Sequence, residues 1–312
     1  MPPSATGSRA TKPRPAKRRR RAGRLGPIRV PPRVRREAPA LSAALESLYA
    51  AYTQPAYVAP DPLQVVRRYA DPRDQEVVGL IAATLAFGNV KGILASTGQV
   101  LQWLPAPHED LRQTPPDAWA GRLHAFRHRY VSGVEMAALL QGMHHVLEQH
   151  GTLGDAFRAG LGPHDKTVLP ALERWVAALR AGAALSKNYL LSDPARGSAC
   201  KRLLMYLRWM VRDDAVDTGA WQDVGAHRLI YPMDTHMHRM ARALGLTRRN
   251  TADLRAAREV TVAMAHLAPQ DPVRYDFCLT RLGIRRDADL DAFVALCRGQ
   301  GGRAPWWLHE GA

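Results

Sequence analysis

The segment Tyr231–Met240 contains the residue with the clearest catalytic potential. Asp234 comes shortly after a proline and directly before an amphipathic helical pattern, so we expect its carboxylate to cap the N-terminus of that helix. A capping carboxylate is held rigidly, and the partial positive charge of the helix end favours its ionised form. For an aspartate considered alone, a purely structural cap is the alternative interpretation.

A lysine with chemical potential lies upstream, at the start of another amphipathic pattern. Lys201 follows Gly197 by a short spacing and precedes the helical pattern from Leu203 to Val211. A lysine under a pocket of low dielectric can lose its proton and act as a nucleophile. An ordinary solvated helix lysine is the alternative for Lys201.

The residues directly before Lys201 are small. Gly197, Ser198 and Ala199 would let a nucleic-acid backbone approach, and Arg196 and Arg202 flank them. Backbone N–H groups at a turn and at a helix N-terminus can bind a phosphate without reading sequence. The alternative is a plain glycine turn between two helices.

Together these segments resemble the helix-hairpin-helix DNA glycosylases. The segment after Tyr231 is similar to the catalytic-aspartate motif of their 8-oxoguanine glycosylase branch at Pro232, Asp234, His236, Met237 and Ala241. It matches the endonuclease III branch at Asp234, Thr235, His236, Arg239, Leu244 and Gly245. The chain is most similar to an uncharacterised bacterial group of this superfamily, and the resemblance covers about residues 60–300.

The resemblance implies an all-α, two-lobed fold and base-excision repair of duplex DNA that contains a damaged base, with 8-oxoguanine the first candidate. Lys201 would attack C1′ of the flipped nucleotide and form a Schiff base that can β-eliminate. Asp234 would stabilise the positive charge that develops at C1′. This chemistry requires neither a metal nor an organic cofactor. The rival interpretations are a non-catalytic nucleic-acid-binding protein and a helical protein–protein scaffold.

The resemblance also implies further DNA contacts. His236 would contact a phosphate, and the turn around Gly197, Ser198, Ala199 and Arg202 would hold the DNA backbone. Asn89 would fill the gap left by the flipped base; a helix C-cap is its alternative role. Residues 213–230 lengthen the segment between the two catalytic candidates and are predicted to form an insertion.

The elements that must position these residues are predicted to be helices, since no segment shows sustained alternation of apolar and polar residues. Gly151 and Gly245 should end two of them, the segment Asn250–Asp253 should cap another, and Pro272 should lie in the first turn of the next. We expect roughly ten helices, with patterns at residues 41–49, 76–104 interrupted at Gly88-Asn89, 136–147, 168–179, 203–211, 235–244, 251–267 and 289–297.

Charge is concentrated at the N-terminus of the 312-residue chain, which has a net charge of +16. Residues 1–40 contain 13 of the 44 Lys and Arg residues and one acidic residue, so we predict a disordered Arg- and Pro-rich arm before an all-α domain at 41–312. The arm would scan DNA phosphates, or it is a dispensable extension or the product of a wrongly chosen start codon.

Other sequence features narrow the class of protein. Cys200, Cys278 and Cys297 have no spacing typical of a disulfide framework, a zinc site or an iron–sulfur cluster. No apolar run is long enough to span a bilayer, and the basic N-terminus lacks the apolar stretch of a secretory signal. We therefore expect a monomeric cytoplasmic protein associated with the nucleoid.

Overall fold

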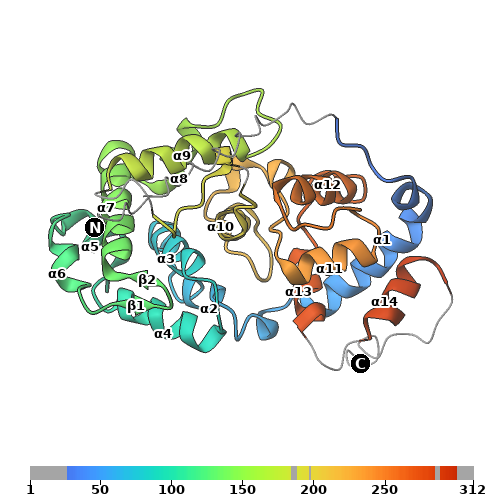
Figure 1. Cartoon of the computed structure of the whole chain (residues 1–312), viewed down its shortest axis with the longest axis horizontal. Helices are drawn as coiled ribbons and strands as arrows, with labels where there is room; N and C mark the ends of the chain where they lie inside the picture. Colours follow the sequence, from blue (N-terminus) through green and yellow to red (C-terminus); the bar gives the residue numbers. More distant parts are fainter. Residues whose placement is uncertain (1–26, 184–187, 197, 285–288, 301–312) are drawn as a thin grey trace, which may run out of the picture.

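The computed structural model describes residues 27–183, 188–196, 198–284 and 289–300 (Figure 1). This part of the chain is predominantly helical, as the sequence predicts. Its strands are β1 (Arg127–His128) and β2 (Val131–Ser132), which pair antiparallel. Its α-helices are α1 (Pro32–Tyr52), α2 (Leu63–Val66), α3 (Pro72–Thr84), α4 (Val90–Leu101), α5 (Pro107–Gln113), α6 (Ala118–Arg122), α7 (Gly133–His150), α8 (Leu153–Ala159), α9 (Leu169–Ala181), α10 (Lys201–Val211), α11 (Thr235–Ala243), α12 (Leu254–Ala265), α13 (Asp276–Ile284) and α14 (Leu290–Cys297).

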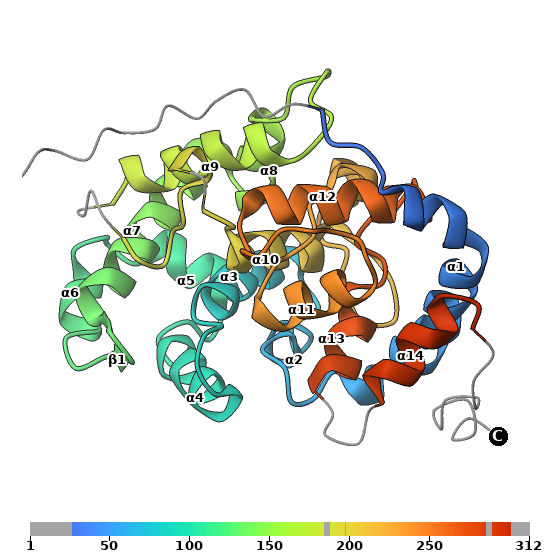
Figure 2. The same cartoon turned by 45° about the vertical axis from the view of Figure 1, so that its right-hand side comes forward.

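The helices form two groups with α10 between them (Figures 1 and 2). Helix α1 packs against α13 and α14, and α11 packs against α13, so both ends of the described chain contribute to one group. Helices α3 to α9 form the other group, and α10 packs closely against α3. A single cluster of buried apolar side chains runs through both groups.

Several predicted helix boundaries are confirmed by the local geometry. Gly151 follows α7 with φ 81°, a left-handed conformation that glycine adopts without the steric cost of a Cβ atom. Gly245 follows α11 with φ 73°. The Asp253 carboxylate accepts a hydrogen bond from the Ala256 N–H at 2.9 Å and caps α12.

The predicted boundary of the N-terminal arm is wrong, because residues 32–40 belong to α1. Pro32 is compatible with the first helical turn, where its missing N–H costs nothing. Val34 is only 1% exposed and continues the buried stripe that leads to Leu41. Arg33 pairs with Glu37 one turn later at 2.9 Å. Of the rest of the predicted arm, residues 27–31 are described and belong to no helix or strand, and residues 1–26 lie outside the described residues.

One further prediction differs from the structure. Pro272 precedes α13 by several residues and is not in its first turn. Residues 213–230, predicted to be an insertion, pack into the core, because the Trp221 ring is buried and its Nε1–H donates to Glu76 in α3 at 2.9 Å. The segment contains the short 3-10 helices η3 (Gln222–Val224) and η4 (Ala226–Arg228). Helices α2, α5, α6 and α8 are too short for a periodic pattern, which is why fewer helices were expected.

A buried network of charges fixes α10 relative to its neighbours. Arg208 contacts Asp217 at 3.1 Å and Asp276 at 2.6 Å, which connects α10 to the following loop and to α13. Arg212 pairs with Asp217 and, at 2.8 Å, with Asp271. Because the loss of one partner would leave a buried charge uncompensated, this network holds α10 in one position.

None of the helices in the described ranges combines the length and apolar character needed to cross a bilayer.

Candidate active site

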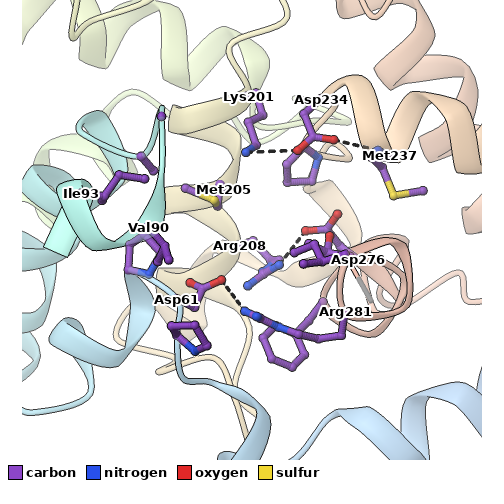
Figure 3. Close-up of a pocket in the computed structure, with 18 residues that line it drawn as sticks. Asp61, Val90, Ile93, Lys201, Met205, Arg208, Asp234, Met237, Asp276 and Arg281 are labelled. Atoms are coloured by element: carbon purple, nitrogen blue, oxygen red, sulfur yellow. Dashed lines mark hydrogen bonds and ion pairs between the residues drawn. The ribbon is translucent and has the colours of Figure 1, made fainter. Parts of the chain in front are cut away.

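Lys201 and Asp234 meet, although they are far apart in the sequence (Figure 3). Lys201 is the first residue of α10, and Asp234 is the N-cap of α11. The Lys201 Nζ lies 3.3 Å from Asp234 Oδ2, and the two side chains are 33% and 32% exposed. A potential nucleophile and a carboxylate therefore lie in contact at a position that solvent and a ligand can reach.

The two oxygens of Asp234 have different environments. Oδ1 accepts a hydrogen bond from the Met237 N–H at 2.7 Å, which confirms the predicted helix cap. Oδ2 faces Lys201. Because Met237 is buried and its N–H is fixed by the helix, the cap holds the carboxylate in the orientation that directs Oδ2 at the amine.

The backbone directly before Lys201 adopts a strained conformation. Cys200 has φ 48°, in the left-handed region that residues with a Cβ atom rarely adopt. Its N–H donates to Ser198 Oγ at 3.3 Å, and its side chain is buried. Strain of this kind costs of the order of 1 kcal/mol and concentrates at functional sites.

The turn predicted before Lys201 lies only partly within the described residues. The segment Pro194–Arg196, which leads into it, is a short 3-10 helix, η2. Asp193 fixes it by accepting a hydrogen bond from the Ala195 N–H at 3.0 Å, and it pairs with Arg180 of α9 at 3.1 Å. Gly197, at the predicted turn, lies outside the described residues.

A cavity of about 210 Å³ lies beside the Lys201–Asp234 pair. Apolar side chains from several elements line it, among them Ile93, Met205, Met237 and Phe277. Its lining also includes Asp61, Arg208, Asp276 and Arg281. Figure 3 shows Lys201 and Asp234 on one side of this cavity and the Asp61–Arg281 pair on the opposite side.

The charged groups of the cavity are already paired with one another. Arg281 contacts Asp61, and Arg208 contacts Asp276 at 2.6 Å. Burial raises the pKa of the Asp276 carboxyl to about 6, although the Arg208 charge opposes this shift. The cavity thus offers both hydrogen-bond donors and acceptors beside an apolar wall. Sequence reasoning did not assign these four residues to the site, because no spacing rule connects positions on separate segments.

A second, more open hollow of about 440 Å³ lies on the other side of Lys201. Lys201, Ala86 and Gly88 line both this hollow and the first cavity. Ser198 and Ala199, predicted to contact the DNA backbone, line the second hollow together with Phe87 and Tyr189. The structure thus brings these two predicted contact residues to the candidate nucleophile.

Arg202, another predicted DNA contact, makes several contacts within the protein. Its guanidinium donates to the carbonyl oxygens of Thr84 and, at 2.7 Å, of Tyr189. The same group lies 5.0 Å from the ring centroids of both Phe87 and Tyr189. Arg202 therefore ties the loop before α10 to the end of α3.

Asn89 and His236 lie on the exposed surface near the site. The Asn89 side chain accepts a hydrogen bond from the Gly92 N–H at 2.7 Å, so it caps the N-terminus of α4. The alternative role considered above, a cap at the C-terminus of the preceding helix, is therefore wrong. His236 lies in the first turn of α11, two residues after Asp234.

Cys200, Cys278 and Cys297 are all free and buried. In the ranges that the structure describes, no cluster of three or more His, Cys, Asp or Glu side chains could hold a metal ion.

Comparison with known proteins identifies the family of the chain. Residues 61–285 match the model of a family described as Protein of unknown function (DUF2400). The match spans well over half of the 312 residues, so the chain belongs to this family. No curated protein and no solved structure matches the chain. The family description assigns no activity, and the geometry around Lys201 and Asp234 therefore carries the functional proposal.

Proposed function

We propose that this member of the DUF2400 family is a DNA glycosylase with AP lyase activity and belongs to the helix-hairpin-helix superfamily. Its substrate is duplex DNA that contains a damaged base. The observation that carries the proposal is the 3.3 Å contact between Lys201 Nζ and Asp234 Oδ2 beside a cavity. The similarity of both segments to the superfamily motifs supports it independently of this contact.

The contact between the two side chains suggests how the nucleophile is generated. The Lys201 ammonium must lose a proton before it can attack, and Asp234 Oδ2 is close enough to accept that proton. The Nζ lone pair then forms a bond to C1′ while the bond between C1′ and the base breaks. The base leaves with the electron pair and takes up a proton. The second Asp234 oxygen is retained by the helix cap throughout, so the carboxylate stays in place.

The lyase step follows from the covalent intermediate. Opening of the sugar ring moves the C1′–O4′ electron pair onto O4′, which is protonated, and leaves a Schiff base between C1′ and Nζ. Removal of a proton from C2′ then allows the C3′–O bond to break, and the 3′ phosphate leaves. Once Asp234 has passed the Lys201 proton on to the departing base, its carboxylate is ionised again and stabilises the positive charge near C1′.

The cavity supports a nucleobase as the group that is released. A cavity of about 210 Å³ with apolar walls and paired charges suits one planar, polar ring system. An oxidised purine such as 8-oxoguanine is our first candidate, on the basis of the motif similarity. Ser198, Ala199, His236 and Asn89 are the proposed DNA contacts around the cavity, and the turn at Gly197 is proposed to take part with them.

Borohydride trapping on a duplex with an abasic site tests the proposal, because reduction converts a Schiff base into a stable covalent adduct. We expect an adduct with the wild-type protein, none with Lys201→Ala, and an undiminished amount with Lys166→Ala, which removes an exposed lysine elsewhere. An adduct that persists in Lys201→Ala would refute the assigned nucleophile. Salt-sensitive DNA binding with no adduct would instead indicate a non-catalytic binding protein, and no DNA affinity at all would leave a protein–protein scaffold.

A further inference from the structure

Two tyrosine rings near Lys201 are exposed to an unusual degree. Tyr130 is 54% exposed and Tyr189 is 51% exposed, and they are two of only five large apolar side chains exposed in the described chain. Their ring centroids lie 4.4 Å apart with an edge-to-face angle of 85°. Exposed aromatic rings that lie together indicate an interaction site more strongly than scattered ones, because they leave a contiguous apolar surface in water.

The surface that carries Tyr130 is rigid. Tyr130 occupies the turn between β1 and β2 and stacks on Phe87 at 5.1 Å, with 20° between the ring planes. His128 in β1 fixes this hairpin to the end of α3, because its Nε2 lies 3.1 Å from the Phe87 carbonyl oxygen. Arg129, the other residue of the turn, has φ 55°, a strained left-handed conformation. The hairpin tip is therefore held in place at an energetic cost.

The loop that carries Tyr189 is equally constrained. The Asn188 side chain donates to the Glu135 carbonyl oxygen at 2.8 Å and accepts from the Leu190 N–H at 2.9 Å. Arg202 holds the Tyr189 carbonyl oxygen at 2.7 Å and lies under the ring. Because the backbone is fixed on both sides of Tyr189, its ring is presented to solvent without the entropic cost of ordering it on binding.

The position of the two tyrosines and the positive charges beside them indicate what they contact. Tyr189 lines the hollow of about 440 Å³ that also contains Lys201, Ser198 and Ala199. Arg129 is exposed on the same turn as Tyr130, and Arg202 lies beneath Tyr189. An exposed aromatic surface bordered by positive charge fits a ligand that combines planar rings with anionic groups, which describes a nucleic-acid strand.

We infer that Tyr130 and Tyr189 form a stacking platform for an unpaired nucleobase next to the nucleotide held at Lys201. The inference rests on the DNA-binding part of the proposed function and not on its covalent chemistry. An apolar segment of a partner protein is disfavoured as the occupant because the platform is bordered by cations, and the experiment below separates the two.

Binding of the full chain to two duplexes tests the platform. One duplex contains a tetrahydrofuran residue, an abasic-site analogue without an aldehyde, opposite an unpaired base; the other is fully paired. Since one base stacked on an aromatic ring contributes roughly 1–3 kcal/mol, Tyr189→Leu and Tyr130→Leu should each weaken binding to the tetrahydrofuran duplex about fivefold or more. Tyr189→Phe should retain wild-type affinity, because it keeps the aromatic face.

A matched control removes an exposed aromatic ring elsewhere. Trp103 is 39% exposed and lines a different hollow, together with Arg122, so Trp103→Leu should bind both duplexes as the wild type does. On the fully paired duplex, the two tyrosine variants should lose no more than about twofold.

The outcomes separate this inference from the proposed function. Wild-type affinity in both leucine variants, or an equal loss on both duplexes, would overturn the platform while borohydride trapping could still succeed. If Tyr189→Leu and Tyr189→Phe bind equally well, stacking is refuted and an apolar protein partner becomes the better interpretation of the surface. If the wild-type protein binds neither duplex, the proposed function itself fails.

Discussion

At the scale of single residues, the contact between Lys201 and Asp234 has chemical rather than structural value. Both side chains are about one-third exposed, and exposed ion pairs contribute only about 0–1 kcal/mol to folding. The contact nevertheless costs both residues their conformational freedom. A rigid carboxylate beside an amine is what proton transfer and charge stabilisation require.

Asp234→Asn should separate folding from catalysis. Asparagine caps a helix about as well as aspartate does, so the Met237 N–H keeps its partner and the free energy of unfolding should change by less than about 1 kcal/mol. Loss of the negative charge beside C1′ should slow base release by on the order of a hundredfold or more. Single-turnover excision from a lesion-bearing duplex, together with DNA affinity, measures both effects.

The control for this substitution is Asp289→Asn, which changes the N-cap of α14, where the Asp289 carboxylate accepts from the Ala292 N–H at 2.9 Å. Excision by this variant should equal that of the wild-type protein. Unchanged turnover in Asp234→Asn would contradict the assigned role of Asp234, and lost DNA affinity would show that the carboxylate acts in binding.

Single residues were predictable from sequence where the signal is local. A helix cap is recognised from the residues that directly follow it: Asp234 caps α11 as expected, and within the predicted capping segment 250–253 the cap of α12 is Asp253. The internal contacts of Arg202 were not predicted, because its partners, Thr84 and Tyr189, are distant or unpatterned in the sequence. A basic residue beside a glycine turn has the same sequence signal whether it faces a phosphate or a carbonyl oxygen.

At the scale of elements, Glu76 connects the helix that supports α10 to the rest of its group. The Glu76 side chain is 3% exposed. Its carboxyl accepts hydrogen bonds from the Leu153 and Gly154 N–H groups at 2.7 and 2.8 Å, at the start of α8. With the bond from Trp221, one carboxyl in α3 fixes both α8 and the segment after α10.

This arrangement predicts a pH-dependent stability. Burial raises the pKa of Glu76 from 4.5 to about 7, so the folded chain binds this proton more tightly than the unfolded chain does. The stabilising contribution is full below about pH 4.5 and is lost as the pH rises through 7. Glu76→Gln cannot titrate. The unfolding free energy of the wild-type protein minus that of the variant should therefore fall by about 2–3 kcal/mol between roughly pH 5 and 8.

Denaturant unfolding across this pH range measures the difference, with Glu173→Gln on the exposed face of α9 as the control. The control should follow the wild-type pH profile. Parallel profiles for the wild type and Glu76→Gln would show that Glu76 stays ionised in the folded protein, held by its three N–H donors.

Elements were predictable where the apolar period runs over several turns, as in α7 and α12. The start of α1 was missed because the basic and proline-rich composition of residues 1–40 concealed Val34, whose burial depends on a tertiary contact. The start of α13 was missed because a proline in a turn and a proline in a first helical turn look alike in sequence.

At the scale of the whole molecule, the candidate cavity is assembled from segments that no local rule connects. Asp61 precedes α2, Arg208 lies in α10, and Asp276 and Arg281 lie in α13. Each charge is neutralised by a partner from another segment, so the cavity exists only once both groups of helices have packed around α10. The sequence motifs therefore indicated Lys201 and Asp234 but not the residues that line the cavity beside them.

The net charge of +16 is also a property of the whole molecule. Because α1 begins at Pro32, the contribution of the N-terminal charge to DNA binding should be tested by a deletion that ends before this helix. Residues 1–26 contain nine Lys and Arg residues and no acidic residue, so their removal leaves a net charge of 16 − 9 = +7. This truncation should lower the affinity for undamaged duplex and reduce the steepness of its salt dependence, because fewer counterions are released on binding. Borohydride trapping at Lys201 should be unchanged.

Removal of residues 1–40 should have a different effect from removal of 1–26. The longer deletion takes away the first turns of α1, including the buried Val34 and the Arg33–Glu37 pair, and should lower the free energy of unfolding by about 1–3 kcal/mol. Affinity titrations at several salt concentrations and denaturant unfolding of both truncations separate charge from packing. If the shorter deletion leaves the salt dependence unaltered, the DNA contacts come from the folded domain, and the basic N-terminal segment does not contribute to binding.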